Sequence, residues 1–203
     1  MVAISTKKKP KLEYVALNIP DGTFTEDDFF EFCQLNDGPK IERLSTGEIV
    51  IMSLIGGNTG IRNTELTTEF GIWNRQKKQG RVFDSSTGFR LPNGAVYSPD
   101  VSWIPLKKWE RLAATQKEKF VPLCPDFICE LASSKRQVNE LKEKMEEFME
   151  NGCRLGWLID PYNKVTYVYL PDKPTDEVSF SKNLTGKGVL KGLRIKMENL
   201  MEV

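Results

Sequence analysis

The sequence predicts an α/β fold in which helices pack on a central sheet, and three observations support this prediction. Two mostly apolar runs, 127–131 and 155–159, are typical of buried strands. Between them, an amphipathic helix is predicted from apolar residues at helical spacing. Strand, helix and strand over this length are typical of a βαβ crossover, which joins two parallel strands.

The N-terminal part is expected to add a helix and a β-hairpin to this core. Residues 1–22 are polar and end in the turn signal Pro20-Asp21-Gly22, so we expect a flexible segment there. Residues 23–203 then form one domain, which is long enough for a full core. Thr25, followed by three acidic residues, is a helix-capping signal. Two short strands around Ser45-Thr46-Gly47 are typical of a hairpin.

The remaining elements follow from apolar spacing and from turn residues. In chain order we expect a long helix over 56–79, short strands over 81–104, a short helix over 106–112, an alternating strand over 165–170, and a short C-terminal β extension.

The absence of histidine excludes several catalytic classes. Without histidine there is no Ser-His-Asp triad, no Cys-His pair and no His-ligated zinc site. Acid–base chemistry must then come from carboxylates, lysines, tyrosines or an activated water, which favours oxygen-liganded ions such as Mg²⁺. The net charge of +1 argues weakly against a dedicated non-specific nucleic-acid binder.

The cysteines and the hydropathy pattern indicate a soluble cytoplasmic protein. The four cysteines have no C-x-x-C spacing, so we expect small buried side chains in a reducing compartment rather than disulfides or zinc ligands. No apolar run approaches the about 18 residues needed to cross a bilayer. The N-terminus also lacks the apolar core of a signal peptide.

Two acidic residues stand out because of their positions. Asp100 follows Pro99 at the start of an apolar strand, and Glu130 lies inside an apolar run. A carboxylate in a buried strand is unfavourable unless it is paired or binds a cation. Each residue alone fits a buried ion pair or a strand-end hydrogen bond. Together in one sheet they favour a metal site, because a divalent cation relieves their mutual repulsion.

Lys144 is a third candidate, on the helix that follows Glu130. On a helical wheel it flanks the apolar stripe, beside Leu141 and Phe148, from where its ammonium could reach the carboxylates. Periodicity alone favours the alternative, a surface lysine whose stem covers apolar side chains. Gln137 projects from the same side two turns earlier and is a candidate supporting residue.

These motifs resemble a known family. The segments 98–101 (SPDV) and 127–131 (FICEL) are similar to the P-D…(D/E)-x-K signature of the restriction-endonuclease-like superfamily. More closely, the chain resembles the Uma2 family (formerly DUF820) of bacterial, often cyanobacterial, endonucleases. The similar stretches run in the same order over 42–161: ERLSTGEIVIMS, STGFRLPNGAVYSPDVSWI, PDFICELASS and KMEEFMENGCRLGWLIDP.

The resemblance implies a restriction-endonuclease-like mixed central sheet flanked by helices. It also implies a metal-dependent endonuclease that hydrolyses phosphodiester bonds in DNA. Asp100 and Glu130 would be ligands of Mg²⁺, for which Mn²⁺ would substitute. The catalytic lysine would be Lys144 rather than the residue at Ala132, and Glu42 would be an additional carboxylate in the site.

Further expectations follow from this assignment. The backbone carbonyl of Cys129 is a candidate metal ligand, and a homodimer is compatible with the family's type of fold. The chain departs from the family in segment 133–137, where two basic residues replace a common Asp, and at Asn58 or Thr59, where relatives carry His. Two alternatives stay open: a catalytically inactive nucleic-acid-binding or regulatory protein on the same fold, and a structural protein whose buried acids form ion pairs.

Overall fold

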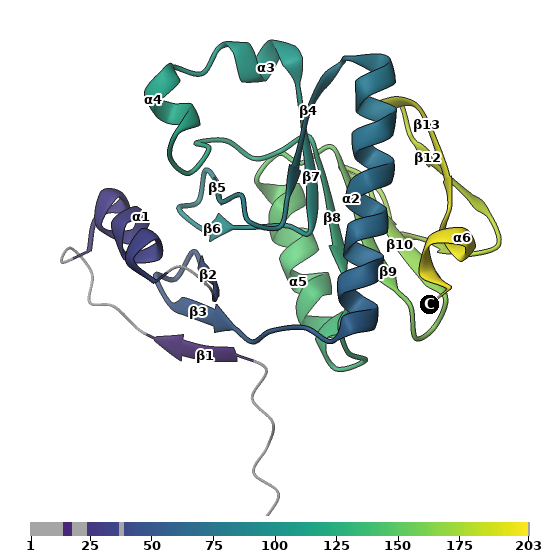
Figure 1. Ribbon diagram of the computed structural model, residues 1–203, viewed down its shortest axis with the longest axis horizontal. Helices are drawn as coiled ribbons and strands as arrows, with labels where there is room; N and C mark the ends of the chain where they lie inside the picture. The colour runs from purple at the N-terminus through teal and green to yellow at the C-terminus, as the bar shows by residue number, and fades with distance from the viewer. Residues whose placement is uncertain (1–13, 18–23, 37–38, 203) are drawn as a thin grey trace, which may run out of the picture.

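The structure, a computed structural model, describes residues 14–17, 24–36 and 39–202 (Figure 1). Of the expected flexible segment 1–22, strand β1 (Tyr14–Leu17) is described, and it pairs antiparallel with β3 (Ile49–Met52). These four residues therefore differ from the expectation, because they pair with a strand edge that would otherwise be open. The rest of the segment lies outside the described residues.

The centre of the fold is a six-stranded sheet in the order β11-β10-β9-β8-β7-β4. Strands β8 and β9 are parallel, and every other neighbouring pair is antiparallel. This arrangement confirms both the mixed sheet and the predicted crossover. The strands are β4 (Gly80–Asp84), β7 (Val101–Pro105), β8 (Phe127–Leu131), β9 (Leu155–Asp160), β10 (Val165–Tyr169) and β11 (Asp176–Ser179).

One long helix covers each face of this sheet (Figure 1). On one face, α2 (Gly57–Lys77) packs Leu66, Phe70 and Trp73 against the strands. On the other face lies the crossover helix α5 (Gln137–Glu150), with buried residues Val138, Leu141, Met145 and Phe148. Burial of each large apolar side chain contributes roughly 1.5–3 kcal/mol. Because both faces are covered, the interior strands β8 and β9 are buried along their whole length and mostly apolar instead of alternating.

Strand β10 illustrates this point. Its sequence predicts alternation, with one face exposed, yet the four residues 166–169 are all buried. The strand lies between β9 and β11, and side chains from both core clusters cover it. The position of the strand in the sheet, which its own sequence does not reveal, decides the burial.

The N-terminal residues form a smaller five-stranded sheet in the order β1-β3-β2-β6-β5. The predicted hairpin is present: β2 (Lys40–Arg43) pairs antiparallel with β3, and Gly47 in the turn has a φ of 88°. Helix α1 (Glu26–Leu35) begins at the predicted cap, where the Thr25 hydroxyl accepts from the Asp28 N–H. Strands β5 (Phe89–Arg90) and β6 (Val96–Tyr97) complete this sheet.

The C-terminal region packs on the α2 side of the central sheet. It forms an antiparallel ribbon of β12 (Asn183–Gly186) and β13 (Leu190–Lys196), followed by α6 (Met197–Met201), a helix that the sequence did not predict. Leu184, Leu190, Leu193, Ile195, Met197, Leu200 and Met201 are buried there. Two short helices, α3 (Leu106–Glu110) and α4 (Ala114–Lys117), follow β7. Within the described residues, no helix has the length and apolarity needed for a membrane crossing.

Candidate active site

Asp100 and Glu130 face the same side of the central sheet. In the antiparallel ladder between β7 and β8, Val101 lies opposite Cys129. By continuation of this register, Asp100 lies level with Glu130, and directly opposed residues have Cβ atoms about 5 Å apart. The carboxylate of Asp100 also accepts a 2.8 Å hydrogen bond from the N–H of Leu131. The two acids are thus neighbours, as the sequence predicted.

The face that carries Glu130 is the one covered by α5. Along β8, Cys129 and Leu131 pack in the core beneath α2, whereas Ile128 and Ala132 pack in the core beneath α5. Side chains alternate between the faces of a strand, so Glu130 points toward α5. The crossover helix therefore lies above this carboxylate.

Lys144 is the residue of α5 that reaches the acids. Its Nζ atom lies 2.9 Å from Oε1 of Glu130 and 2.8 Å from Oε2 of Glu42. The Lys144 side chain is only 11% exposed, and its ammonium lies 4.8 Å from the centre of the Tyr97 ring. The predicted reach of Lys144 is confirmed for Glu130, and the surface-lysine alternative is wrong.

Glu42 enters the site from β2, in the N-terminal sheet. It is 2% exposed, and its Oε1 atom accepts a 2.9 Å hydrogen bond from the N–H of Ser98. Ile41, the preceding residue, packs instead beside Phe29 of α1. Because strand residues alternate, Ile41 anchors the hairpin while Glu42 faces Lys144.

Lys40 is a site residue that the sequence analysis missed. Its Nζ atom lies 3.8 Å from both Glu42 Oε1 and Asp100 Oδ1, and its side chain is 25% exposed. The one available signal was its spacing of two residues from Glu42, which places both on one face of β2. The contact with Asp100 arises from docking of the hairpin and has no local signal.

The charges in the site influence one another strongly. Burial acts to raise the pKa of Glu42, but Lys144, Lys40 and the Ser98 N–H together hold it below its usual value. At Glu130, burial outweighs Lys144 and Lys40, and the pKa is raised. Burial acts to lower the pKa of Lys144, but the two glutamates raise it above its usual value. Lys144 is therefore a permanent cation near neutral pH, not a general base.

The donor set is compatible with a hard divalent cation. Oε1 of Glu130 is fully buried and has no aligned hydrogen-bond donor, although the Lys144 ammonium lies 2.9 Å away. A carboxylate has several lone pairs, so Glu130 can accept a cation in addition to the Lys144 ammonium. Among the described residues, no group of three or more acidic or cysteine side chains is arranged to hold a metal. The fit therefore depends on two carboxylates, a number typical of Mg²⁺ sites that keep several waters.

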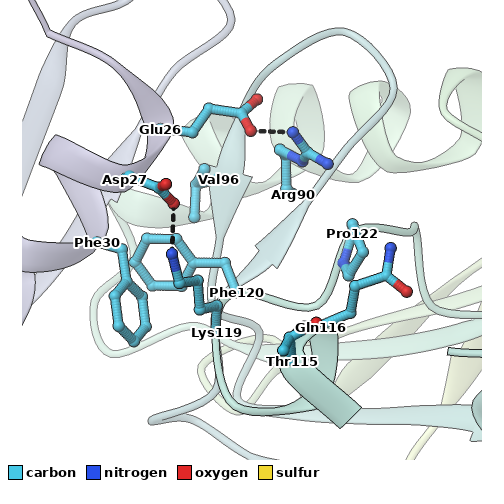
Figure 2. Close-up of a pocket in the computed structure, with 10 residues that line it drawn as sticks. All are labelled: Glu26, Asp27, Phe30, Arg90, Val96, Thr115, Gln116, Lys119, Phe120 and Pro122. Atoms are coloured by element: carbon cyan, nitrogen blue, oxygen red, sulfur yellow. Dashed lines mark hydrogen bonds and ion pairs between the residues drawn. The ribbon is translucent and has the colours of Figure 1, made fainter. Parts of the chain in front are cut away.

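A pocket elsewhere in the N-terminal region is separate from these residues (Figure 2). This cavity of about 240 Å³ lies between α1, α4 and the β5–β6 strands. Two ion pairs line it, Glu26 with Arg90 and Asp27 with Lys119. Val96 lines the pocket, whereas the next residue, Tyr97, faces Lys144 on the other side of β6. The ion pairs attach α1 to the rest of the fold.

Comparisons with known proteins agree with this architecture. The model of the Uma2 family, described as "Putative restriction endonuclease", matches residues 26–198. This chain belongs to the Uma2 family. The match extends beyond the motifs within 42–161 and takes in α1 and the C-terminal ribbon. No curated protein matches the chain.

A solved structure has the same fold as this Uma2 chain. It is described as a "putative nuclease belonging to DUF820" from Anabaena variabilis ATCC 29413. The two have a TM-score of 0.70 and 18% sequence identity over 88% of this chain and 97% of the other. At this identity the likeness establishes the fold alone.

The register of β7 against β8 indicates whether the backbone carbonyl of Cys129 is free to bind a metal in this Uma2 chain. Alternate residues of a strand direct their backbone groups at the same neighbouring strand. The N–H of Leu131 points at Asp100. The backbone N–H and carbonyl of Cys129 therefore also point toward β7, where Cys129 pairs with Val101 in the ladder. The register therefore argues against the carbonyl of Cys129 as a ligand. The carbonyl of Leu131, beyond the last paired residue of β7, is the better candidate.

Gln137 contacts the loop that precedes α5. Its side-chain oxygen accepts 2.9 Å hydrogen bonds from the N–H and the hydroxyl of Ser133. Its own N–H donates to the hydroxyl of Ser134. These bonds fix the start of the helix that carries Lys144. The described hydrogen bonds of Gln137 are to Ser133 and Ser134 at the start of α5, not to the acids.

Proposed function

We propose that the chain is a metal-dependent endonuclease that hydrolyses phosphodiester bonds in DNA. The observation that carries this proposal is that Asp100 lies level with Glu130 on the neighbouring strand, while the buried cation of Lys144 pairs with Glu130. Membership of the Uma2 family supports the nuclease class. Metal dependence and DNA as substrate belong to the proposal.

The carboxylates of Asp100 and Glu130, with the carbonyl of Leu131, would hold Mg²⁺ or Mn²⁺. When bound, such an ion polarises a phosphoryl oxygen as a Lewis acid. Without such an ion, the two acids would repel the negative charge of a phosphodiester. The bound cation and the neighbouring Lys40 and Lys144 would offset this repulsion.

Lys144 would stabilise negative charge on the phosphate in the transition state. Its ammonium is buried, protonated and held from two sides by Glu42 and Glu130, so it needs little rearrangement during the reaction. A preorganised donor of this kind contributes about 3 kcal/mol. Glu42 positions Lys144, and the Ser98 N–H positions Glu42.

Lys40 would act at the entrance of the site. Its ammonium is partly exposed and near both Glu42 and Asp100, where it reduces the repulsion between the acids and an approaching phosphate. It would therefore assist binding of the substrate more than the chemical step.

A second candidate function is nucleic-acid binding without cleavage. The observation that favours it is that Lys144 already pairs with both buried glutamates, so the acids are partly compensated without a metal. In this alternative the same residues maintain the fold and perform no chemistry.

A plasmid-nicking assay distinguishes the two functions. In the presence of Mg²⁺, wild-type protein should convert supercoiled plasmid to the nicked form, and Asp100→Ala should reduce the rate by at least about 100-fold. Glu110→Ala, an exposed acid on α3, is the matched control and should retain the wild-type rate. Equal activity of Asp100→Ala and wild type would contradict the proposal. Calorimetric titration with Mg²⁺ or Mn²⁺ should also show binding to wild type and to the control alone.

A further inference from the structure

We propose that a second surface, far from the candidate active site, binds the phosphate backbone of duplex DNA. We name it the basic ridge and define it by five side chains: Arg75, Lys77, Lys78, Lys191 and Arg194. It combines the C-terminal end of α2 with strand β13. The proposal extends beyond cleavage, because binding to the ridge does not require the acids of the active site.

The charge of the chain is distributed very unevenly. Segments 71–81 and 180–196 hold nine of the 29 basic residues and none of the 28 acidic ones. The rest of the chain therefore carries 20 basic against 28 acidic residues. A net charge of +1 conceals this asymmetry. A local concentration of lysine and arginine on one face is the electrostatic signature of a nucleic-acid contact.

The fold brings the two segments together. The indole N–H of Trp73 donates a 3.2 Å hydrogen bond to the carbonyl of Lys191. A Cβ atom at Gly192 would lie 3.0 Å from Cε of Lys77. Gly192 has a φ of 80°, which a glycine adopts without strain. At Gly192 the alternation of buried and exposed residues along β13 is interrupted. Leu190 and Leu193 are therefore both buried, while Lys191 is exposed beside α2.

The five ridge side chains are exposed and carry uncompensated charge. In the described part of the chain, none of them forms an ion pair with an acid. Of the acids that flank the ribbon in the sequence, Asp176 pairs with Lys187 at 3.8 Å and Glu198 with Lys196 at 2.6 Å. Phosphates of a ligand would thus meet cations whose charge is still available.

The ridge is separate from the active site. The ribbon packs in the core on the α2 face of the sheet, whereas Glu130 and Lys144 lie on the α5 face (Figure 1). Helix α2 starts near the hairpin that carries Glu42 and runs about 30 Å to the ridge, at a rise of 1.5 Å per residue. DNA bound at the ridge is therefore held by contacts that take no part in the chemistry.

The character of the ridge favours nucleic acid over a membrane. A helix that binds a lipid surface needs an exposed apolar face. Of the large apolar residues of α2, Leu66, Phe70 and Trp73 are instead buried in the core, and the exposed Ile61 and Ile72 are about three turns apart and form no continuous apolar face. Across the ribbon, Arg194 lies opposite the polar Thr185. Long cations on a polar background fit a phosphate backbone, which is bound largely through charge.

The test measures binding without cleavage. Fluorescence anisotropy of a labelled DNA duplex is recorded in EDTA at a series of salt concentrations. The two ridge variants are Arg75→Glu/Lys77→Glu and Lys191→Glu/Arg194→Glu. The control is Lys107→Glu/Lys173→Glu, which changes the net charge equally at exposed sites elsewhere. Thermal unfolding shows that each variant is folded, and Lys191→Gln/Arg194→Gln adds a milder change.

Wild type and control should bind DNA alike, and each ridge variant should bind about tenfold more weakly. The slope of log K against log salt should fall by about 2 in each ridge variant, and the glutamine variant should be intermediate. Unchanged binding in the ridge variants, or an equal loss in the control, would overturn the proposal. So would a preference of wild type for anionic vesicles over DNA. Asp100→Ala should bind DNA with the affinity of wild type. A ridge that does not bind DNA can therefore be distinguished from an active site that does not cleave it.

Discussion

The ammonium of Lys144 lies 2.9 Å from the carboxylate of Glu130, although one residue belongs to a helix and the other to the strand that precedes it. The crossover helix packs back over β8, which places the lysine above the acid. Ala132, two residues after Glu130, is 1% exposed beneath the same helix. There is no room for a lysine at that position, so α5 supplies the cation.

Lys144→Met is expected to abolish cleavage and to destabilise the fold. It leaves Glu42 and Glu130 buried without their common cation, which should lower the free energy of unfolding by about 3–5 kcal/mol. The nicking rate should fall by about 100-fold or more. Urea unfolding and the plasmid assay measure the two effects. Lys142→Met, on the same helix, should change the nicking rate little, and a fully active Lys144→Met would disprove the assigned role.

Combining Lys144→Met with Glu42→Gln should restore part of the lost stability. The double variant removes one uncompensated charge along with the cation, so the two effects are not additive. We expect a coupling energy of about 1–3 kcal/mol from a double-mutant cycle in urea. Additivity within about 0.5 kcal/mol would indicate that the two side chains do not interact.

Acid should remove the stabilisation that Glu42 provides. Its folded-state pKa lies below the usual 4.5, so its contribution is present above that value and is lost as the pH falls through the folded-state pKa. Wild type should therefore lose more stability than Glu42→Gln as the pH is lowered below 4.5. Urea midpoints at neutral and acid pH measure the difference. Parallel pH profiles of the two proteins would refute the assignment.

Gly156→Ala should disturb the contact between α5 and β9. A Cβ atom there would lie 2.5 Å from Cε of Met145 and 3.4 Å from Cβ of Tyr169. We expect a loss of about 1–3 kcal/mol in unfolding free energy. The nicking rate should also fall, because the same helix carries Lys144. At Gly57 an added Cβ meets nothing within 4 Å, so Gly57→Ala is the control and should retain both properties.

Local patterns in the sequence were sufficient to predict much of the fold. The apolar runs around Glu130 and 155–159 predicted two buried strands, and the length between them predicted their parallel pairing. The position of Asp100 after Pro99 at a strand start marked it as a ligand candidate. These features depend on neighbours in the chain, which the sequence displays directly.

The remaining features depend on contacts between distant residues. Periodicity placed Lys144 on the flank of its helix, and only the family resemblance favoured it as a site residue. Lys40 meets Asp100 because a hairpin docks beside β7, and no local pattern encodes that contact. The charges of the basic ridge come from segments about 100 residues apart, so the overall net charge gave no indication of them.

The dependence of the α2-side core on the C-terminal ribbon has a consequence for synthesis of the protein. All of Glu42, Asp100, Glu130 and Lys144 leave the ribosome before the ribbon does. Until residues 184–201 have been synthesised, the face of β8 opposite Glu130 lacks part of the apolar side chains that pack against it. The nascent chain thus carries all four candidate site residues before it has a core able to hold them in place.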